Sequence, residues 1–191
     1  MTIQLVGNNT VENVTTEIYV LAHSSSTGAA SLTVTGDGSL TADGSSKGIW
    51  VQSNGGGATL EINNPKVEAE RGNFSGDAGV MVQAGDSSGA SLTVDDGSLT
   101  ATGTGSESGI HFQFGSNTGS GASSLTVSGN TIVRASGGIY DNSSANIQIK
   151  TDDNYSGGIV WNGKDGTVYS DVELQEDLKI DNRRGREPDA G

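Results

Sequence analysis

The sequence predicts an all-β fold in which the chain winds as a parallel β-helix, or β-solenoid, of about six coils with three short strands per coil. Two observations support this. Near-identical words recur, since ASLTV occupies residues 30–34 and again 90–94, and GSLTA occupies 38–42 and again 97–101. Apolar and polar residues alternate within each word, which is the period of a β-strand. A β-sandwich is the alternative, but the recurrence of the words argues against it.

The first strand of each predicted coil carries two apolar residues two positions apart, so that both point to one face. These pairs are Ile3/Leu5, Leu32/Val34, Leu60/Ile62, Leu92/Val94, Leu125/Val127 and Ile147/Ile149. The second strand contains Leu40/Ala42, Val67/Ala69, Leu99/Ala101 and Val133/Ala135. The third contains Ile18/Val20, Ile49/Val51, Val80/Val82, Ile110/Phe112, Ile139 and Ile159/Trp161.

Successive first strands are 29, 28, 32, 33 and 22 residues apart, which is too short for each unit to fold alone. Three brief strands cannot bury a face without neighbours, so the units must stack. Each strand then pairs in parallel with its equivalent in the next coil, and the inward Leu, Val and Ile residues form columns. We predict a single solenoid domain over residues 1–181. An irregular or disordered tail follows over 182–191, because it has no further coil to pair with.

Composition narrows the class of protein and the kinds of partner. Only 32% of the 191 residues are hydrophobic and 30 are Gly, which suits a slender domain better than one with a wide core. Acidic residues outnumber basic ones by 23 to 10, for a net charge of −13, so nucleic acid and anionic membranes are repelled. No apolar run reaches membrane-spanning length, so we expect no membrane insertion. The absence of Cys excludes disulfides and cysteine metal sites.

The repeated SLTV, GSLTA and GI words, followed by GTVYSDVELQEDLKI at residues 166–180, resemble bacterial surface proteins of the right-handed β-helix, carbohydrate-binding type. The resemblance covers roughly residues 1–180 and implies a right-handed fold similar to that of the pectate lyases. It also implies an extracellular or cell-surface location and a polysaccharide or surface glycan as partner. Members of that group usually begin with an export signal, whereas residues 1–6 already have the pattern of a strand. We therefore interpret the chain as a piece of a longer surface protein.

No arrangement of residues predicts catalysis. The resemblance implies that enzymes on this fold carry clustered Asp with Arg or Lys on one strand column, as acid–base chemistry requires. Here the two internal arginines, Arg71 and Arg134, fall on different columns, and His23 and His111 fall in different coils. The acidic pair at 152–153 would point to opposite faces of an extended strand. We therefore predict a non-catalytic protein.

Asp37, Asp95 and Asp96 occur in the turns TGDGS and VDDGS, which recur at one corner of the predicted solenoid two coils apart. Carboxylate oxygens together with backbone carbonyls suit Ca²⁺. Asp is also a residue that a tight turn prefers, and this is the interpretation we favour. The sequence requires no cofactor, and Ca²⁺ is retained as an alternative ligand of these turns.

The outward positions of the third strand form the candidate ligand site. One residue per coil lies between the two inward residues: Tyr19, Trp50, Met81, His111, Tyr140 and Val160. An amide follows two positions later at Gln52, Gln83, Gln113, Asn142 and Asn162. Aromatic rings beside amides suit sugars, and a coil rise of about 4.8 Å is close to the length of one pyranose. We predict a polysaccharide along Tyr19, Trp50, His111 and Tyr140. The alternatives are a stripe covered by a neighbouring domain, a second copy or a turn such as 70–77, and rings that are merely exposed.

Three further hypotheses remain. A structural spacer or stalk of an adhesin, with no glycan ligand of its own, is the main alternative function. Ice binding by Thr rows is disfavoured, because Glu61 and Gln148 interrupt one row and Glu68 and Arg134 interrupt the next. Self-association, end to end or side by side, is expected because open coil ends expose strand edges, and the edge that begins at Thr2 has no visible cap.

Overall fold

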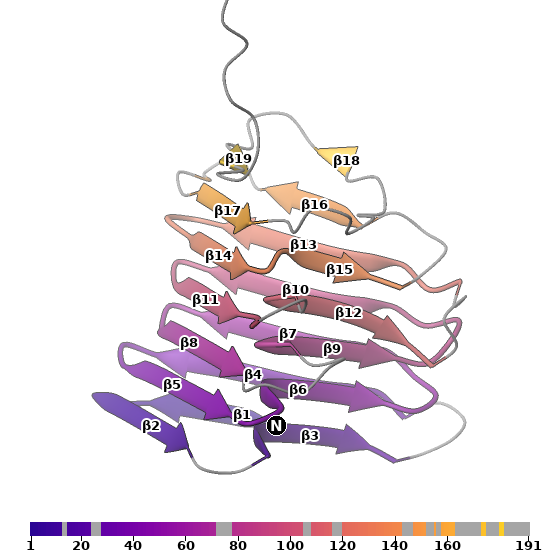
Figure 1. Cartoon of the computed structure of the whole chain (residues 1–191), viewed down its shortest axis with the longest axis horizontal. Coiled ribbons are helices and arrows are strands. Elements are labelled where there is room, and N and C mark those ends of the chain that lie inside the picture. The colour runs from indigo at the N-terminus through magenta and orange to yellow at the C-terminus, as the bar shows by residue number, and fades with distance from the viewer. Residues whose placement is uncertain are drawn as a thin grey trace, which may run out of the picture.

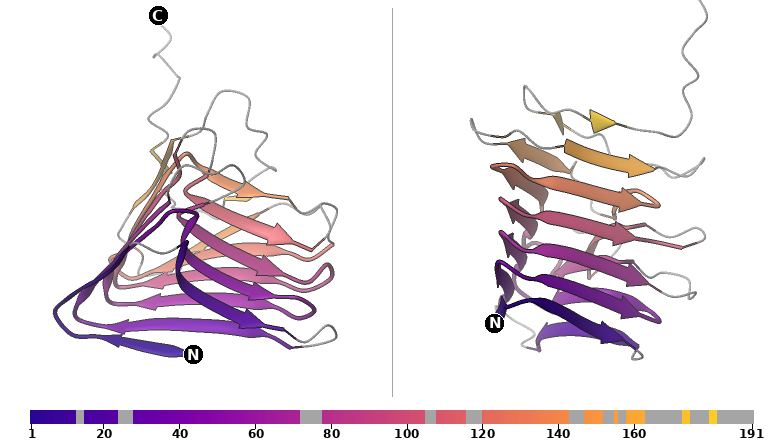
Figure 2. Two further views of the ribbon diagram at one scale, coloured as in Figure 1. Left: turned by 60° about the horizontal axis from the view of Figure 1, so that its bottom comes forward. Right: turned by 90° about the vertical axis from the view of Figure 1, so that its left-hand side faces the viewer.

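The computed structural model describes residues 1–12, 15–23, 28–71, 78–104, 108–115, 120–142, 147–151, 155, 158–162, 173–174 and 180–181. Over these residues the chain winds into a parallel β-solenoid whose three sheets form three sides of a prism (Figure 1). The coils stack with the N-terminal coil at one end (Figure 2). The all-β solenoid predicted from the repeated words, with three strands per coil, is confirmed.

All strand pairs in the three sheets are parallel. The first sheet contains β1 (Thr2–Leu5), β4 (Ala30–Gly36), β7 (Ala58–Asn63), β10 (Ala90–Asp95), β13 (Ser123–Ser128), β16 (Gln148–Thr151) and β18 (Glu173–Leu174). The second contains β2 (Asn8–Glu12), β5 (Ser39–Gly44), β8 (Lys66–Arg71), β11 (Ser98–Thr102), β14 (Ile132–Ser136), β17 (Gly158–Asn162) and β19 (Ile180–Asp181). The third contains β3 (Thr16–Ala22), β6 (Lys47–Ser53), β9 (Val80–Ala84), β12 (Ile110–Phe114) and β15 (Ile139–Asp141).

The core consists of columns of apolar side chains that run along the solenoid axis. Leu32, Leu60, Leu92 and Leu125 occupy one such column, each in register with the next and each fully buried. The second sheet contributes smaller residues, because Ala42, Ala69 and Ala101 are in register across β5, β8 and β11. Stacking therefore buries the inward Leu and Ala residues of these middle coils against their neighbours, as the repeat lengths required.

The corner between the first and second sheets needs a left-handed backbone. Gly36 is the last residue of β4, and Asn64, Asp96 and Gly129 come directly after β7, β10 and β13; all four have positive φ angles. Gly, Asn and Asp adopt this conformation at the lowest cost. The corner is therefore built from residue types that tolerate a left-handed backbone.

The predicted register is wrong by two residues in the first and last coils of the first sheet. Ile3 pairs with Val34 and not with Leu32, and Leu125 pairs with Ile149 and not with Ile147. A slip of two residues keeps every side chain on the same face of the strand. The alternating pattern cannot detect such a slip, and the degraded words of these two coils offer no other marker.

The assignment of Ile159 and Trp161 to the third strand is also wrong. β17 pairs with β14 in the second sheet, where Ile159 is in register with Val133. The first coil has a second strand that the pattern did not reveal, because Asn9 occupies the position of Leu40 in the inward column. Val160 and Asn162 consequently do not belong to the outward stripe of the third sheet.

The last described strand, β19, ends at Asp181. The predicted tail over 182–191 lies outside the described residues, so the predicted end of the solenoid at residue 181 stays a prediction. Within the ranges given above, the chain forms no helix with the length and apolar character needed to cross a bilayer.

Candidate functional site

The outward stripe of the third sheet is assembled in register. Tyr19 pairs with Trp50, Trp50 with Met81, Met81 with His111, and His111 with Tyr140. One side chain per coil therefore lies above the next along the solenoid axis, as the sequence predicted for these five residues.

The aromatic side chains of the stripe form two separate pairs. The ring centroids of Tyr19 and Trp50 are 4.5 Å apart with an angle of 27° between the ring planes, which is a stacked pair. His111 and Tyr140 form an edge-to-face pair with centroids 4.8 Å apart and an angle of 69°. Both geometries are favourable for aromatic rings.

Met81 separates the two pairs and is only 1% exposed, although its register places it on the outer side of the sheet. The middle of this outer face is therefore covered. Tyr19, by contrast, is 44% exposed, and Trp50 and Tyr140 are partly exposed. A ligand that ran along the whole axis would find open ring surface at the ends of the stripe and not at its centre.

Trp50 is held on more than one side. Tyr19 stacks on its ring, and the ammonium Nζ of Lys47 lies 4.5 Å from the ring centroid in a cation–π arrangement. Lys47 is itself nearly buried. Because Tyr19 lies on β3, the first strand of its sheet, the side of its ring that faces away from Trp50 is the most accessible aromatic surface of the stripe.

The amide column predicted beside the rings is present over three coils. Gln52 is in register with Gln83, and Gln83 with Gln113, and all three are partly exposed. Asn142 has a different role, because its side-chain Oδ1 accepts a hydrogen bond from the backbone N–H of Phe114 at 2.8 Å. That side chain extends the strand ladder and is not offered to a ligand.

A chain of hydrogen bonds connects the rings to the amides at the N-terminal end. The hydroxyl of Tyr19 donates to Oε1 of Gln52, and Nε2 of Gln52 donates to Oδ1 of Asn54 at 3.0 Å. The orientations of the Tyr19 ring and the Gln52 amide are therefore coupled. An aromatic ring surface with an oriented amide beside it suits the binding of a sugar, which stacks on the ring and hydrogen-bonds to the amide.

His111 is partly exposed as a residue, but one of its ring nitrogens is not. Its Nε2 is buried without a hydrogen-bond partner in the part of the chain that the structure describes. Burial lowers the pKa of its imidazole to about 4, and the nearby charge of Lys47 contributes to the lowering. The neutral imidazole is therefore the form that the fold accommodates.

We expect His111 to make the folded chain less stable as the solution becomes more acidic. The unfolded chain binds a proton at His111 below about pH 6.5, whereas the folded chain binds it only below about pH 4. The free energy of unfolding should thus decrease as the pH falls from 6.5 towards 4, by about 2–3 kcal/mol from this group. Urea titrations of the wild type and of His111→Gln across this range would measure it.

The control for this experiment is His23→Gln, which removes an exposed imidazole. The relevant quantity is the difference in unfolding free energy between the wild type and each variant, since the carboxylates titrate equally in all three proteins. If the difference between the wild type and His111→Gln is the same at pH 7 and pH 4.5, the imidazole is not held in its neutral form.

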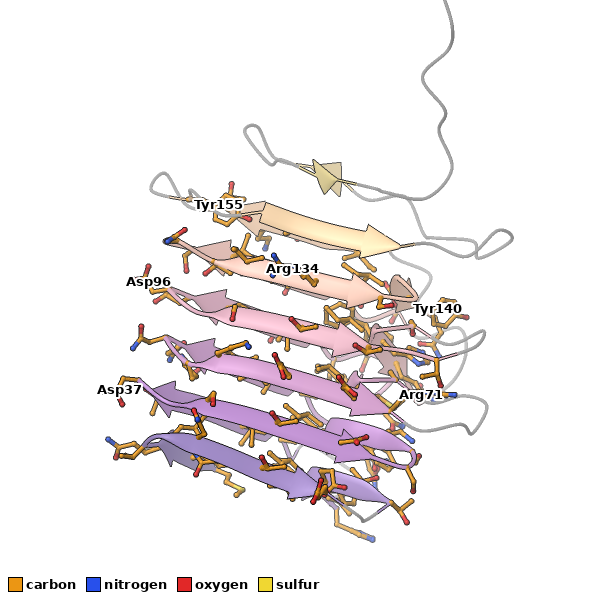
Figure 3. The ribbon with its side chains drawn as sticks, turned by 60° about the vertical axis from the view of Figure 1, so that its left-hand side comes forward. Asp37, Arg71, Asp96, Arg134, Tyr140 and Tyr155 are labelled. Atoms are coloured by element: carbon orange, nitrogen blue, oxygen red, sulfur yellow. The ribbon has the colours of Figure 1, made fainter. Side chains whose placement is uncertain are left out.

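The three candidate calcium ligands lie at one corner but do not converge. Asp37 and Asp96 project from different coils of this corner (Figure 3). By the register of Thr35, Asn63 and Asp95 the two turns are two coils apart, or about 10 Å, whereas the oxygens around one Ca²⁺ lie within about 2.5 Å of it. Among the described residues no group of three or more His, Asp or Glu side chains could hold a metal ion.

The carboxylates of Asp95 and Asp96 have partners within the fold. Asp95 Oδ1 accepts a hydrogen bond from the hydroxyl of Ser128 at 2.6 Å, and Asp96 Oδ1 accepts one from the backbone N–H of Asn130 at 3.0 Å. Asp96 also supplies the left-handed corner residue of its coil. These contacts join adjacent coils at the corner, which is a structural role consistent with the preference of Asp for turns.

The residues weighed for catalysis are not brought together. Arg71 is buried at one corner, where its Nε donates to the hydroxyl of Thr104 at 3.2 Å, and Arg134 is exposed on the second sheet (Figure 3). His23 follows β3, whereas His111 lies in β12. The acidic pair at 152–153 lies outside the described residues.

The threonine rows are interrupted by charged residues, as expected, but the interruption differs in one coil. Thr33, Thr93 and Thr126 share a column with Glu61 and with Lys150, which takes the place predicted for Gln148 because of the register slip. Thr10 joins Thr41 and Thr100 on the second sheet, and Glu68 and Arg134 interrupt that column.

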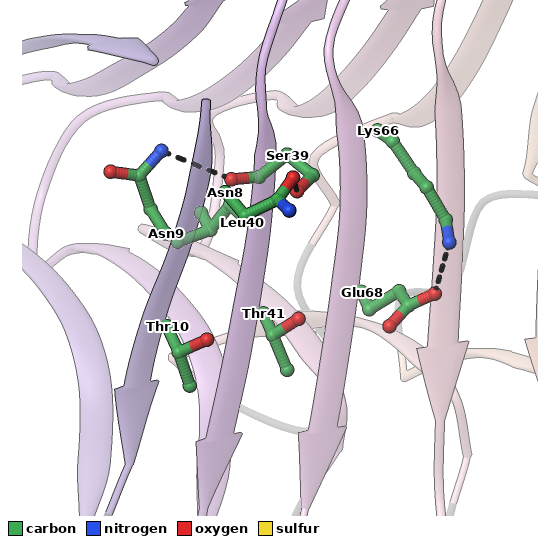
Figure 4. Close-up of a pocket in the computed structure, with 8 residues that line it drawn as sticks. All are labelled: Asn8, Asn9, Thr10, Ser39, Leu40, Thr41, Lys66 and Glu68. Atoms are coloured by element: carbon green, nitrogen blue, oxygen red, sulfur yellow. Dashed lines mark hydrogen bonds and ion pairs between the residues drawn. The ribbon is translucent and has the colours of Figure 1, made fainter. Parts of the chain in front are cut away.

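The structure contains a hollow that the sequence analysis missed, on the outer side of the second sheet over β2, β5 and β8 (Figure 4). It has a volume of about 330 Å³ and is lined by Asn8, Asn9, Thr10, Ser39, Leu40, Thr41, Lys66 and Glu68. Lys66 Nζ and Glu68 Oε1 form an ion pair at 2.7 Å on one side. The hollow could have been predicted only if residues 8–12 had been recognised as a strand. The polar Asn9 at an inward position breaks the apolar alternation of that strand.

Comparison with known proteins does not place the chain in a family. No protein-family model matches it, and no curated protein and no solved structure is significantly similar to it.

Proposed function

We propose that the chain is a non-catalytic glycan-binding or adhesion module that acts outside the cell, at a bacterial surface. The extracellular location rests on the resemblance of the repeated words. Binding rests on one structural observation, which is the exposed ring of Tyr19 stacked on Trp50 and hydrogen-bonded to Gln52.

The proposed ligand is a polysaccharide whose sugar ring stacks on Tyr19 and whose hydroxyls contact Gln52. The amide column continues this surface, since Gln83 and Gln113 follow Gln52 in register at intervals of one coil. A rise of about 4.8 Å per coil approximates one pyranose unit. Successive sugars could therefore meet successive amides, with the aromatic contact at the N-terminal end of the solenoid.

We expect Tyr19→Ala to weaken glycan binding by about tenfold, which corresponds to the 1–1.5 kcal/mol typical of an aromatic contact. The unfolding free energy should change by less than about 1 kcal/mol, because the Tyr19 side chain is 44% exposed and lies outside the core. Glycan-array screening would find the ligand, and calorimetric titration of both proteins would measure the affinity.

Tyr140→Ala is the matched control, since it removes the same side chain from the other end of the stripe, beyond the buried Met81. It should leave the affinity unchanged if the contact is confined to the N-terminal end. Trp50→Ala is a poorer probe, because Trp50 also packs against Tyr19 and Lys47. Unaltered affinity in Tyr19→Ala would remove the basis for this site.

A structural spacer with no glycan ligand is the second candidate. The observation that favours it is the burial of Met81 and of His111 Nε2, which closes the middle of the stripe. Absence of binding to both neutral and acidic glycans, at protein concentrations at which the fold is intact, would support the spacer.

A further inference from the structure

Asn54 and Gly55 form an Asn-Gly step in the turn that follows β6. The sequence contains one other such step, at Asn162 and Gly163. The side chain of Asn54 is exposed, and neither Asn54 nor Gly55 belongs to a strand. Asn-Gly steps are prone to deamidation, because a glycine has no side chain to shield its nitrogen from the preceding carboxamide. The fold decides whether that nitrogen is free to react.

Hydrogen bonds hold both sides of this turn but bypass the nitrogen of Gly55. The N–H of Asn54 donates to the carbonyl of Ala22 at 3.2 Å. The N–H of Gly56 donates to the hydroxyl of Ser53 at 2.8 Å, so this side chain satisfies the turn backbone one residue later. Within the described residues the N–H of Gly55 has no hydrogen-bond partner. The nitrogen that would attack is therefore kept in place and is not engaged.

The carboxamide of Asn54 is oriented for the loss of ammonia. Nε2 of Gln52 donates to Oδ1 of Asn54 at 3.0 Å. A donor at this oxygen draws electrons from Cγ and stabilises the negative charge that develops on the oxygen when a nucleophile adds. With Oδ1 directed to Gln52, Nδ2 of Asn54 donates to no residue that the structure describes. The leaving group is thus unhindered by a hydrogen bond within the fold.

We propose that Asn54 is a site of spontaneous deamidation in the folded protein. The backbone nitrogen of Gly55 loses its proton to solvent and forms a bond to Cγ of Asn54. The Cγ–Nδ2 bond then breaks, and ammonia leaves with a proton from water, which gives a succinimide ring. Water opens the ring by adding to one of its carbonyls, and the nitrogen of Gly55 recovers its proton. The net reaction consumes water, releases ammonia and leaves a carboxylate at position 54.

The packing of the turn on the next coil favours aspartate over isoaspartate as the product. A Cβ on Gly85 would lie 2.8 Å from the carbonyl carbon of Gly55, so the two backbones are in close contact. The N–H of Gly85 also donates to the carbonyl of Gly56 at 3.0 Å. Isoaspartate adds a methylene group to the main chain just before these contacts, whereas aspartate leaves the main chain unchanged. Fragmentation of the modified peptide distinguishes the two products. An isoaspartate share as large as that formed in the unfolded chain would contradict this packing argument.

Peptide mapping by mass spectrometry, after incubation of the folded chain at mildly alkaline pH, is the first test. Each deamidation raises the mass of its peptide by about 1 Da. Asn162 is the internal comparison, because it also precedes a Gly but belongs to β17, where it pairs with Ser136. We expect Asn54 to react at least about fivefold faster than Asn162 in the folded chain, and the two to react at similar rates in urea. Equal rates in the folded chain, or no reaction at Asn54, would overturn the proposal.

Two substitutions in the amide column test the role of the hydrogen bond to Oδ1. Gln52→Leu removes the donor and should slow the deamidation of Asn54 about fivefold, as expected for the loss of one neutral hydrogen bond. Gln83→Leu is the matched control, because Gln83 occupies the same column one coil further along and should leave the rate unchanged. Equal rates in the two variants would show that Gln52 does not activate the carboxamide.

Asn54→Gln tests the assignment to this residue. Its longer side chain cannot form the succinimide ring, so the more acidic species that ion exchange resolves from the aged wild type should be absent at this position. Accumulation of the same acidic species at the wild-type rate would assign the reaction to another residue and overturn the proposal.

The modification alters the proposed glycan surface, and this consequence alone rests on the proposed function. A carboxylate at position 54 only accepts hydrogen bonds, so Gln52 keeps Nε2 directed to it and Oε1 directed to the hydroxyl of Tyr19. The new negative charge lies beside the amides. It should repel acidic glycans and leave neutral ones unaffected.

Calorimetric titration of Asn54→Asp with neutral and acidic glycans tests this consequence. We expect the affinity for acidic glycans to fall about threefold relative to neutral ones. Thr126→Asp adds the same charge on the first sheet and should leave the ratio of the two affinities unchanged. Equal changes in both variants would mean that net charge, and not the position of residue 54, governs the selectivity. Deamidation itself is measured without glycan, so its failure and the failure of glycan binding are distinguishable.

Discussion

Leu92→Asp should destabilise the chain by on the order of 5 kcal/mol, which is enough to unfold most domains of this size. Leu92 is fully buried between Leu60 and Leu125 of the adjacent coils. A carboxylate at this position would have no cation or hydrogen-bond donor among the apolar residues of its column, and burial of an unpaired charge is among the most destabilising changes known. Chemical denaturation followed by circular dichroism would measure the loss.

The control is the same substitution on the outer side of the same sheet. Thr126→Asp lies between Thr93 and Lys150, so it should be neutral or slightly stabilising. Thr93→Asp is less suitable, because Glu61 is its neighbour in register and adjacent like charges add a small cost. Comparable losses from Leu92→Asp and Thr126→Asp would mean that the first sheet does not bury the Leu column.

The sequence predicted the middle of the solenoid well, because two independent signals agree there. The alternation of apolar residues defines the inward face, and the repeated words define the register. Leu32, Leu60, Leu92 and Leu125 therefore pair as expected. The strand composition, the three sheets and the in-register stripe from Tyr19 to Tyr140 all follow from these two signals.

The predictions failed where only one signal was available. Alternation alone does not distinguish Ile147 from Ile149 as the partner of Leu125, because both lie on the same face. The GIVW segment at residues 158–161 has the GI word that precedes third strands elsewhere, yet β17 pairs in the second sheet. Register in a solenoid is a property of contacts between coils, and a single degraded repeat contains little information about it.

The candidate site shows a further limit. Alternation predicts which side of a strand a residue occupies, but not whether that side is open. Met81 is on the outer side and buried, whereas Val11 is on the inner side and exposed. Whether a side of a strand is covered depends on contacts made outside that strand, which its own alternation does not encode.

The glycines at the corners are required for two different reasons, and the sequence indicates only one of them. At the corner before the second sheet, Gly36 and Gly129 have positive φ angles, as expected for turn residues. Gly48, the second residue of β6, and Gly79 and Gly109, which precede β9 and β12, are needed for another reason. A Cβ on any of them would lie within 3 Å of backbone atoms in its own coil and in the next one.

Gly79→Ala should accordingly cost about 3 kcal/mol, since overpacking against backbone cannot be relieved by a change of rotamer. The added Cβ would lie 2.4 Å from the carbonyl oxygen of Ala69 and 2.7 Å from the amide nitrogen of Thr102. The carbonyl of Gly79 also accepts a hydrogen bond from the N–H of Ile49 at 3.0 Å, so a shift of this residue would disturb three successive coils.

Gly89→Ala is the matched control, because Gly89 is exposed and its Cβ would make an ordinary contact of 3.6 Å with Ala122. That change should be neutral or slightly stabilising, through the lower entropy of the unfolded chain. Urea midpoints of the two variants should therefore move in different directions or by very different amounts, and equal shifts would show that the corner before the third sheet does not need a residue without a side chain.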